Sequence, residues 1–356
     1  MRITSVITGT MLVVVAGACA EQGQDPLALE PQFAVAGGGR LAVYNGGTAN
    51  PAFARPCLTD QRYRQFDFWL GRWDAGGLNA PAPNTTSQIR NILDGCVIAE
   101  NWSGGTGRSI NAFDPDNGEW HQTWVTRFHQ GHLRLHGNLQ GTDMVMTGSR
   151  VQPNGVEWLD DYRWTPSGET HVVQAFSLVV RLGSTISFQT NGAVRYTRPV
   201  TLEVGPPRPG TGQCTATGLS FQSRELDFWL GKWTVSDGNG TILGTARITN
   251  ELEGCLIEEN YHTTVGYGAI GFAYFDFVEK KWYRTYIDSE GERTEVSGNL
   301  SGNAMVMTGM EQGKDGPLHV RATIEPVDAN TVRQVWEISR DGMNWVTDVS
   351  LIFTRK

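Results

Sequence analysis

The sequence predicts an all-β protein made of two tandem antiparallel β-barrels, with a β-sandwich as the alternative. Three observations support this fold class. Apolar residues alternate with polar ones, as Leu133 and Leu135 do, and turn signals such as Asp237-Gly238-Asn239-Gly240 recur at short intervals. No stretch shows the pattern of a three-turn helix. Many short strands without helices to cover them must either close into a barrel or pack as a sandwich.

A compact aromatic motif occurs twice and marks the start of each predicted barrel. Phe66-Asp67-Phe68-Trp69-Leu70-Gly71-Arg72-Trp73 returns as Leu226-Asp227-Phe228-Trp229-Leu230-Gly231-Lys232-Trp233, and later segments match in the same order. We expect the first part of each motif to form a helical turn that plugs one end of a barrel. The glycine then releases the chain into the first strand, which begins at the second tryptophan.

Each repeat ends on a strand that closes in Thr-Arg, and this arginine favours a barrel over a sandwich. Arg198 is predicted to lie over Trp73, and Arg355 over Trp233. A guanidinium on an indole ring contributes ~0.5–2 kcal/mol, and here it would hold the last strand to the first.

The two repeats also define the domains. The first unit spans residues 57–199 and the second spans 214–356, joined by a linker rich in proline and glycine at 200–213. A unit of about 140 residues is long enough to bury its own core. Residues 1–20 are predicted to be a signal peptide, and 21–56 a flexible tether.

Two cleavage sites are open to this signal peptide. Cleavage before Cys19 would give a lipoprotein with a lipid on that cysteine, whereas cleavage after Ala20 would release a secreted protein. We favour the lipoprotein, exported to the periplasm or anchored in the outer membrane, with the lipid as its link to the membrane. The formal charge of −8 at pH 7 argues against nucleic acid as a partner.

The other four cysteines fall as one pair in each repeat. This spacing predicts two disulfides within the units, Cys57–Cys96 and Cys214–Cys255, and none between them. Each would stabilise its unit by ~3–4 kcal/mol in the chain-entropy model. Paired cysteines also agree with export, because disulfides persist in oxidising compartments.

Three motifs together resemble a known bacterial family. They are the opening at residues 66–73, the strand Gly95-Cys96-Val97-Ile98-Ala99-Glu100-Asn101-Trp102, and the strand Trp120-His121-Gln122-Thr123-Trp124. The family is exported and of unknown function, and its members are predicted to be calycin-like β-barrels, akin to lipocalins and fatty-acid-binding proteins. The resemblance covers both units and implies this fold for each of them, but it brings no established activity.

Two glutamates and their aromatic neighbours are the candidate ligand-binding residues. A carboxylate that faces a barrel lumen could bind a polar ligand head or act as a base, or it could pair with an arginine or face solvent. The aromatic residues could line a pocket or fill the core. The candidates are Glu100, Trp102, Gln122 and Trp124 in the first unit, and Glu259, Tyr261, Arg284 and Tyr286 in the second.

Several histidines cluster in the first unit, and we considered them as ligands of a metal or a haem. They are His121, His129, His132 and His136. The second unit has no histidine at the corresponding positions, so we interpret these histidines as polar residues on an exposed hairpin. We predict neither a metal nor a cofactor.

Three function classes remain open from the sequence. The first is an envelope protein that binds a small apolar or amphipathic ligand in one or both lumens. The second is an enzyme that uses Glu100 or Glu259 as acid or base, and the third is a structural or interaction module with filled barrels. We favour binding, because no catalytic motif occurs. An anionic amphiphile should prefer the second unit, which offers Arg284, unless Glu259 already occupies that guanidinium.

Overall fold

The computed structural model describes residues 56–102, 106–128, 131–198, 200, 202, 214, 222–313 and 316–356. The predicted signal peptide with Cys19, almost all of the tether and most of the linker lie outside these residues. Within the described part of the chain, no helix combines the length and the apolar composition that a membrane-spanning helix requires.

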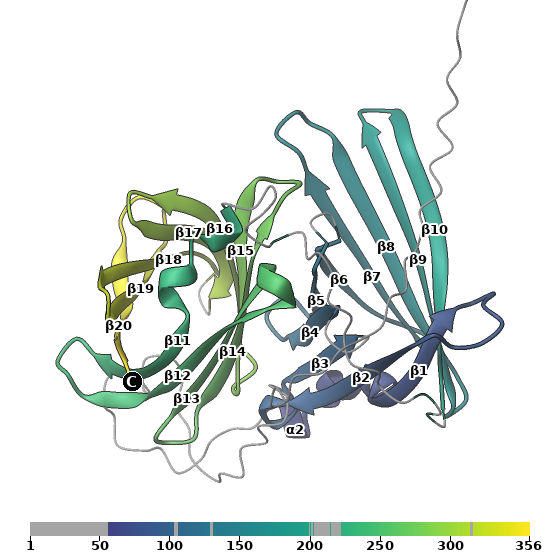
Figure 1. Cartoon of the computed structure of the whole chain (residues 1–356), viewed down its shortest axis with the longest axis horizontal. Coiled ribbons are helices and arrows are strands. Elements are labelled where there is room, and N and C mark those ends of the chain that lie inside the picture. Colours follow the sequence, from purple (N-terminus) through teal and green to yellow (C-terminus); the bar gives the residue numbers. More distant parts are fainter. Residues whose placement is uncertain are drawn as a thin grey trace, which may run out of the picture.

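Two closed antiparallel barrels of ten strands each form the structure (Figure 1). Neighbouring strands in the sequence pair with each other, and in each barrel the last strand returns to pair with the first. The predicted tandem barrels are therefore confirmed, and the sandwich is excluded. The strands of the first barrel are β1 (Gly71–Gly77), β2 (Thr85–Ile92), β3 (Val97–Trp102), β4 (Gly107–Asp114), β5 (Glu119–Thr126), β6 (Leu133–Gln140), β7 (Asp143–Val151), β8 (Glu157–Ser167), β9 (His171–Leu182) and β10 (Thr185–Thr197). Those of the second are β11 (Gly231–Asp237), β12 (Ile242–Glu251), β13 (Leu256–Thr263), β14 (Gly268–Asp276), β15 (Lys281–Asp288), β16 (Arg293–Ser301), β17 (Ala304–Gly313), β18 (Gly316–Asp328), β19 (Thr331–Ser339) and β20 (Val346–Arg355).

The helical elements that the structure describes are all short. They are α2 (Pro56–Thr59), η1 (Gln61–Arg64), η2 (Asp67–Trp69), η3 (Leu93–Gly95), η4 (Gln222–Arg224), η5 (Asp227–Trp229) and η6 (Leu252–Gly254).

The repeated aromatic motif forms the plug at the end of each barrel. Phe66 and Trp69 are fully buried, and their rings stack at 5.1 Å. A helical turn leaves carbonyl groups at its end without partners. The strand that follows supplies one, because the Trp73 indole nitrogen donates to the Trp69 carbonyl oxygen at 2.8 Å. Trp233 and Trp229 repeat this bond at 2.9 Å, which explains the fixed spacing of the two tryptophans.

The late arginines close the barrels as predicted. The Arg198 guanidinium lies 3.8 Å from the centre of the Trp73 ring, and that of Arg355 lies 4.3 Å from Trp233. Arg355 also donates to the Leu230 carbonyl oxygen at 3.0 Å. The last strand is thus tied both to the first strand and to the plug.

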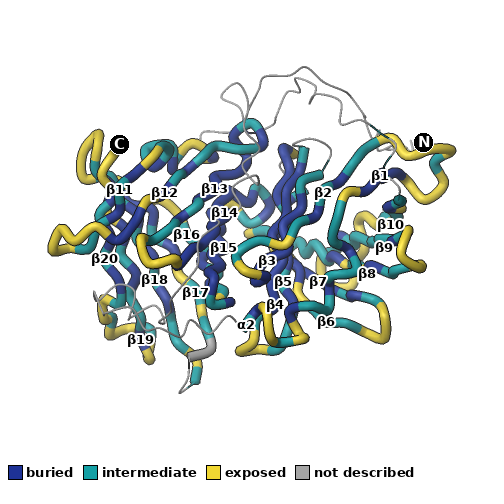
Figure 2. Tube along the Cα trace, turned by 90° about the horizontal axis from the view of Figure 1, so that it is seen from below, coloured by how far each residue is buried: buried dark blue, intermediate teal, exposed yellow. Residues whose placement is uncertain are grey.

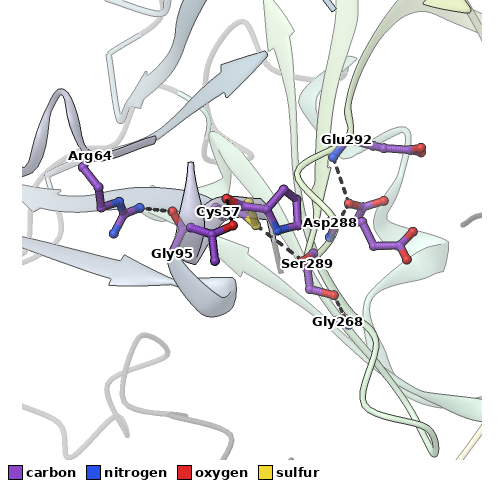
Figure 3. The surroundings of a disulfide bond; sticks show 11 residues. Cys57, Arg64, Gly95, Gly268, Asp288, Ser289 and Glu292 are labelled. Carbon is purple, nitrogen blue, oxygen red and sulfur yellow. Dashed lines mark hydrogen bonds between the residues drawn. A yellow bond between two sulfur atoms is a disulfide. The ribbon is translucent and has the colours of Figure 1, made fainter. Parts of the chain in front are cut away.

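Both predicted disulfides are present, Cys57–Cys96 and Cys214–Cys255. Gly95 precedes the second cysteine of the first pair at a φ of +93°, and a Cβ there would lie 3.1 Å from the Cys57 carbonyl oxygen. Glycine therefore allows the lead-in segment to approach the sheet. Figure 3 shows that this disulfide lies against a turn of the second barrel, where the Cys96 sulfur is 3.5 Å from the Ser289 carbonyl oxygen.

The outer faces of the two barrels pack against each other. Figure 2 shows that buried strands, β3–β5 and β13–β15, lie where the barrels meet. Thr123 and Thr285 hold equivalent positions in the two repeats, and their hydroxyl groups form a hydrogen bond of 2.8 Å. The barrels thus meet through equivalent faces, in the manner of a two-fold dimer. Buried apolar residues such as Phe272 join the core of the first barrel across this contact.

Candidate functional site

A glutamate from the third strand of each barrel projects into the lumen and is buried there. Glu100 on β3 is 4% exposed and lies opposite Ser109 of β4, and Glu259 on β13 is 3% exposed and lies opposite Gly271 of β14. Both belong to the predicted ligand-binding residues. Burying an ionised carboxylate is costly unless a cation or hydrogen bonds compensate for the lost water. The two lumens provide this compensation differently.

In the second lumen, Glu259 forms an ion pair with Arg284 of β15. One guanidinium nitrogen of Arg284 donates to the Glu259 carboxylate at 2.5 Å, and both side chains are buried. The side-chain amide of Gln334 is oriented so that its oxygen faces these donors. It accepts hydrogen bonds from two guanidinium nitrogens of Arg284, at 3.0 and 2.9 Å, and from the indole nitrogen of Trp336 at 3.1 Å. The cation is therefore held by one acid and one amide.

Aromatic rings enclose the same guanidinium. Its central carbon lies 5.3 Å from the centre of the Trp229 ring and 5.0 Å from the rings of both Tyr286 and Trp336. Arginine at such distances gains cation–π energy in addition to its ion pair. Tyr286 and Trp336 are 8% and 9% exposed, so the second lumen is filled around Arg284 by its own side chains.

In the first lumen, Glu100 has hydrogen bonds but no cation. Ser87 donates to it at 2.8 Å, Ser109 at 3.3 Å and Tyr196 at 3.4 Å. Among the described residues, no lysine, arginine or histidine forms an ion pair with this carboxyl group. Burial raises the pKa of Glu100 to about 7, although the three hydrogen bonds act in the opposite direction. Burial also raises the pKa of Tyr196 well above its ordinary value, so this hydroxyl keeps its proton.

Strand pairing shows which residues of the two lumens correspond. Tyr196 pairs with Val172 in the first barrel, as Phe353 pairs with Val332 in the second. Counting along β9 and β19 from these pairs makes Gln174 equivalent to Gln334. The same register makes Phe176 equivalent to Trp336. The aligned motifs give the other correspondences, which are Trp69 with Trp229, Glu100 with Glu259, Trp124 with Tyr286 and Gln122 with Arg284.

The aromatic residues above Glu100 are more accessible than their counterparts in the second barrel. Trp102, Trp124, Tyr162 and Phe176 are partly exposed, whereas Tyr286 and Trp336 are buried. Trp102 packs edge-on against Tyr196 at 5.9 Å, and Tyr162 stacks on Phe176 at 5.7 Å. The first lumen thus has a polar layer around Glu100 between the aromatic plug and a partly exposed aromatic mouth.

An open hollow adjoins this mouth at Phe176. It has a volume of about 700 Å³ and lies between the turn after β1 and the strands β8–β10. β1 pairs with β10 only from Asp74 to Gly77, and the rest of β10 continues beyond it (Figure 1). The hollow therefore lies beside the point where the first and last strands separate.

Some of the predicted candidates lie beside a buried glutamate, and others make separate contacts. Arg284 and Tyr286 lie together near Glu259 in the second lumen. Gln122 instead donates to Asn111 at 2.7 Å. Trp124 lies over Gly107, where a Cβ would come within 2.4 Å of its ring. Tyr261 packs edge-on against Tyr267 at 6.2 Å.

Sequence reasoning did not select Tyr196, Gln174, Phe176 or Gln334, which all belong to these sites. Tyr196 and Phe353 precede Thr-Arg at the end of each repeat, so the aligned ends of the repeats could have identified Tyr196. The two glutamines lie on strands whose register the sequence left open.

The histidine cluster differs from the prediction of an exposed hairpin. His132 is 1% exposed, because its ring packs edge-on at 5.0 Å against Tyr274 of the second barrel. His121 is partly buried and His136 is exposed, and His129 lies outside the described residues. The neighbouring barrel, which the sequence pattern cannot place, buries His132.

The fold and the site define a class of protein with two tandem β-barrels and a buried acid in each lumen. No family model matches the chain, and no curated protein matches it. Among solved structures, a protein of unknown function from the DUF3598 family of Nostoc punctiforme is similar. The similarity covers 83% of this chain and 99% of that chain, with 11% sequence identity and a TM-score of 0.17. At this TM-score the match informs neither fold nor function, and the motif resemblance to an exported bacterial family stays a resemblance.

Proposed function

We propose that this protein is an exported binding protein that holds a small amphipathic molecule in the lumen of its first barrel. The observation that carries the proposal is Glu100, a buried acid without an ion pair among the described residues, below partly exposed aromatic rings. A few polar groups within an aromatic lining are typical of sites that orient small ligands. The second lumen supports binding less well, because Arg284 and Glu259 already occupy each other.

The proposed export has independent support in the two disulfides. Bonds of this kind persist in oxidising compartments and are rare in the cytosol. We include lipidation at Cys19 in this proposal on the sequence pattern alone. A lipid anchor would hold the barrels at a membrane, where amphipathic molecules are concentrated.

Native mass spectrometry of the full protein, purified from its own host, tests the function directly. We expect a bound small molecule that is released on denaturation. The variant Phe176→Ala removes a ring from the mouth of the first lumen and should lower the fraction of protein that carries the bound molecule. The matched control Phe188→Ala removes an exposed ring from the projecting part of β10 and should leave occupancy unchanged. Purified protein that carries no bound molecule, and that also fails to bind the neutral dye Nile red, would contradict the proposal.

Acid–base catalysis in the same lumen is a second candidate, because the pKa of Glu100 is raised to about 7. A group that titrates near neutral pH can both take up and release a proton at a reacting centre. The two candidates differ in what happens to the bound molecule. Incubation of the released molecule with fresh protein should return it unchanged for a binding protein, and altered for an enzyme.

A further inference from the structure

The second lumen contains a cation that the protein supplies itself. Arg284 reaches from β15 to the centre of the lumen, where it meets the carboxylate of Glu259 and the rings of Trp229, Tyr286 and Trp336. This shell combines an acid with several aromatic faces. It is the arrangement by which proteins also recognise organic cations as ligands.

Among the described residues, the first lumen retains the shell but has a neutral side chain in place of the cation. Glu100 replaces Glu259, Gln174 replaces Gln334, and Trp69, Trp124 and Phe176 provide the three rings. At the position of Arg284 stands Gln122, a neutral amide that donates to Asn111 at 2.7 Å and not to Glu100. The first lumen therefore has a buried acid and an aromatic enclosure around a position where none of the residues that the structure describes places a positive charge.

We propose that the first lumen binds an organic cation, an amine or a guanidinium on a small apolar body, whose charged group takes the place that Arg284 holds in the second lumen. This inference rests on the proposed function and specifies its ligand class. The charged group would pair with Glu100 and lie among the aromatic rings, and the apolar body would extend toward the mouth at Trp102 and Tyr162.

The charge of the ligand decides which molecules this lumen accepts. An ionised Glu100 attracts a cation strongly in a low-dielectric surrounding, and it repels a carboxylate there. A neutral ligand gains only apolar contacts and hydrogen bonds. The carboxyl group of Glu100 accepts hydrogen bonds from Ser87, Ser109 and Tyr196, where the second lumen has Ala246, Gly271 and Phe353. These hydroxyl groups keep the acid satisfied without a ligand.

Binding should also depend on pH, because the cation needs Glu100 in its ionised form. The groups that face Glu100 are Ser87 on β2, Ser109 on β4 and Tyr196 on β10, and Tyr196 keeps its proton. With its pKa raised to about 7, Glu100 is mostly ionised at about pH 8 and mostly protonated at about pH 6. The affinity for a cation should therefore fall about tenfold between these two conditions.

Isothermal titration of the full protein with octylamine, octanol and octanoate tests the proposal, because these probes share one chain and differ in charge. At about pH 8 we expect octylamine to bind at least about tenfold more tightly than octanol, and octanoate to bind most weakly. Glu100→Gln should remove the preference for the amine while octanol still binds. This variant also shows whether octylamine merely collects on the acidic surface of the protein.

A second variant, Gln122→Arg, gives the first lumen its own cation. It should stay folded, pair with Glu100 and weaken octylamine binding at least about tenfold. The control Arg333→Met, which breaks an exposed ion pair with Glu325 in the second barrel, should leave octylamine binding unchanged. Equal affinities for octanol and octylamine, or tighter binding of octanoate, would overturn the cation inference while the binding function stands. If none of the three probes binds the natural protein, the cation inference is overturned, and the binding of Nile red then decides whether the binding function stands.

Discussion

Two equivalent glutamates show how one buried acid can be satisfied in two ways. Glu259 pairs with a neighbouring guanidinium, whereas Glu100 receives hydrogen bonds from three hydroxyl groups and has a pKa raised to about 7. Hydrogen bonds from neutral groups compensate only part of the cost of burying a negative charge, because they carry no opposite charge. Glu100 therefore binds a proton at pH values where an exposed glutamate has lost it.

This difference predicts a pH-dependent stability that belongs to Glu100. Between about pH 4.5 and about pH 7 the folded protein holds a proton that the unfolded chain has released, so its stability falls as the pH rises. Glu100→Gln should remove this penalty and gain up to ~3 kcal/mol over the natural protein above about pH 7, but little near about pH 4.5. Urea unfolding across this range measures the effect, with the exposed Glu169→Gln as control. Parallel curves for the natural protein and Glu100→Gln would contradict the raised pKa.

At the scale of the element, the plug and the first strand act as one unit. The first strand begins at the glycine of the motif and not, as predicted, at the tryptophan that follows it, and this glycine also leaves room for the late arginine. Gly231 has a φ of +142°, and a Cβ there would lie 2.5 Å from a guanidinium nitrogen of Arg355. Gly71 stands in the same relation to Arg198, with a φ of +121°. The motif therefore needs glycine for its backbone conformation and for the contact that closes the barrel.

Replacement of this glycine should cost more than backbone strain alone. Gly231→Ala should lower the free energy of unfolding by ~2–4 kcal/mol, since it strains the backbone and displaces Arg355 from Trp233. The control Gly302→Ala has a φ of +66° and no atom within 4 Å of the new Cβ, so it should cost only ~1 kcal/mol. Chemical denaturation compares the two variants. Equal losses would mean that Arg355 adapts without cost.

At the scale of the whole molecule, the two barrels meet through equivalent faces that carry opposite charges. In the ion pairs described between the barrels, the arginine comes from the first barrel and the carboxylate from the second. Arg134 is one example. It donates to Asp276 at 3.1 Å, contacts Glu279 and lies 3.4 Å from the centre of the Tyr283 ring. Such a pattern favours the contact between unlike barrels, because like barrels would bring like charges together.

Removal of this arginine should weaken the whole molecule. Arg134→Met retains an apolar stem but leaves buried carboxylates without their cation, so it should cost ~3–5 kcal/mol. The control Arg333→Met breaks an exposed pair with Glu325 and should cost less than ~1 kcal/mol. Chemical denaturation gives both values, and separate unfolding transitions for the barrels would show that the contact has opened. A loss in Arg134→Met no larger than in the control would mean that apolar packing alone joins the barrels.

The sequence by itself determined the fold of each barrel. The repeated aromatic motif, the paired cysteines and the terminal arginines predict a plug, two disulfides and two cation–π contacts, and the structure contains all of them. These features depend on local spacing and on alternation along a strand, which a sequence displays directly. The same alternation placed Glu100 and Arg284 among the candidate residues. It also offered Glu259 as the partner of Arg284, which the structure shows it to be.

Only the tertiary structure decided what covers each outward face and which distant strands align. Alternation shows that Thr123 points away from its lumen, but it cannot show that a second barrel lies against it. His132 is buried for the same reason, contrary to the exposed position predicted for it. The equivalence of Phe176 and Trp336 depends on the register of long strands, which closure of the barrel fixes and composition does not. The aligned motifs already place Gln122 opposite Arg284, but that register decides which glutamine and which ring complete the surroundings of each glutamate.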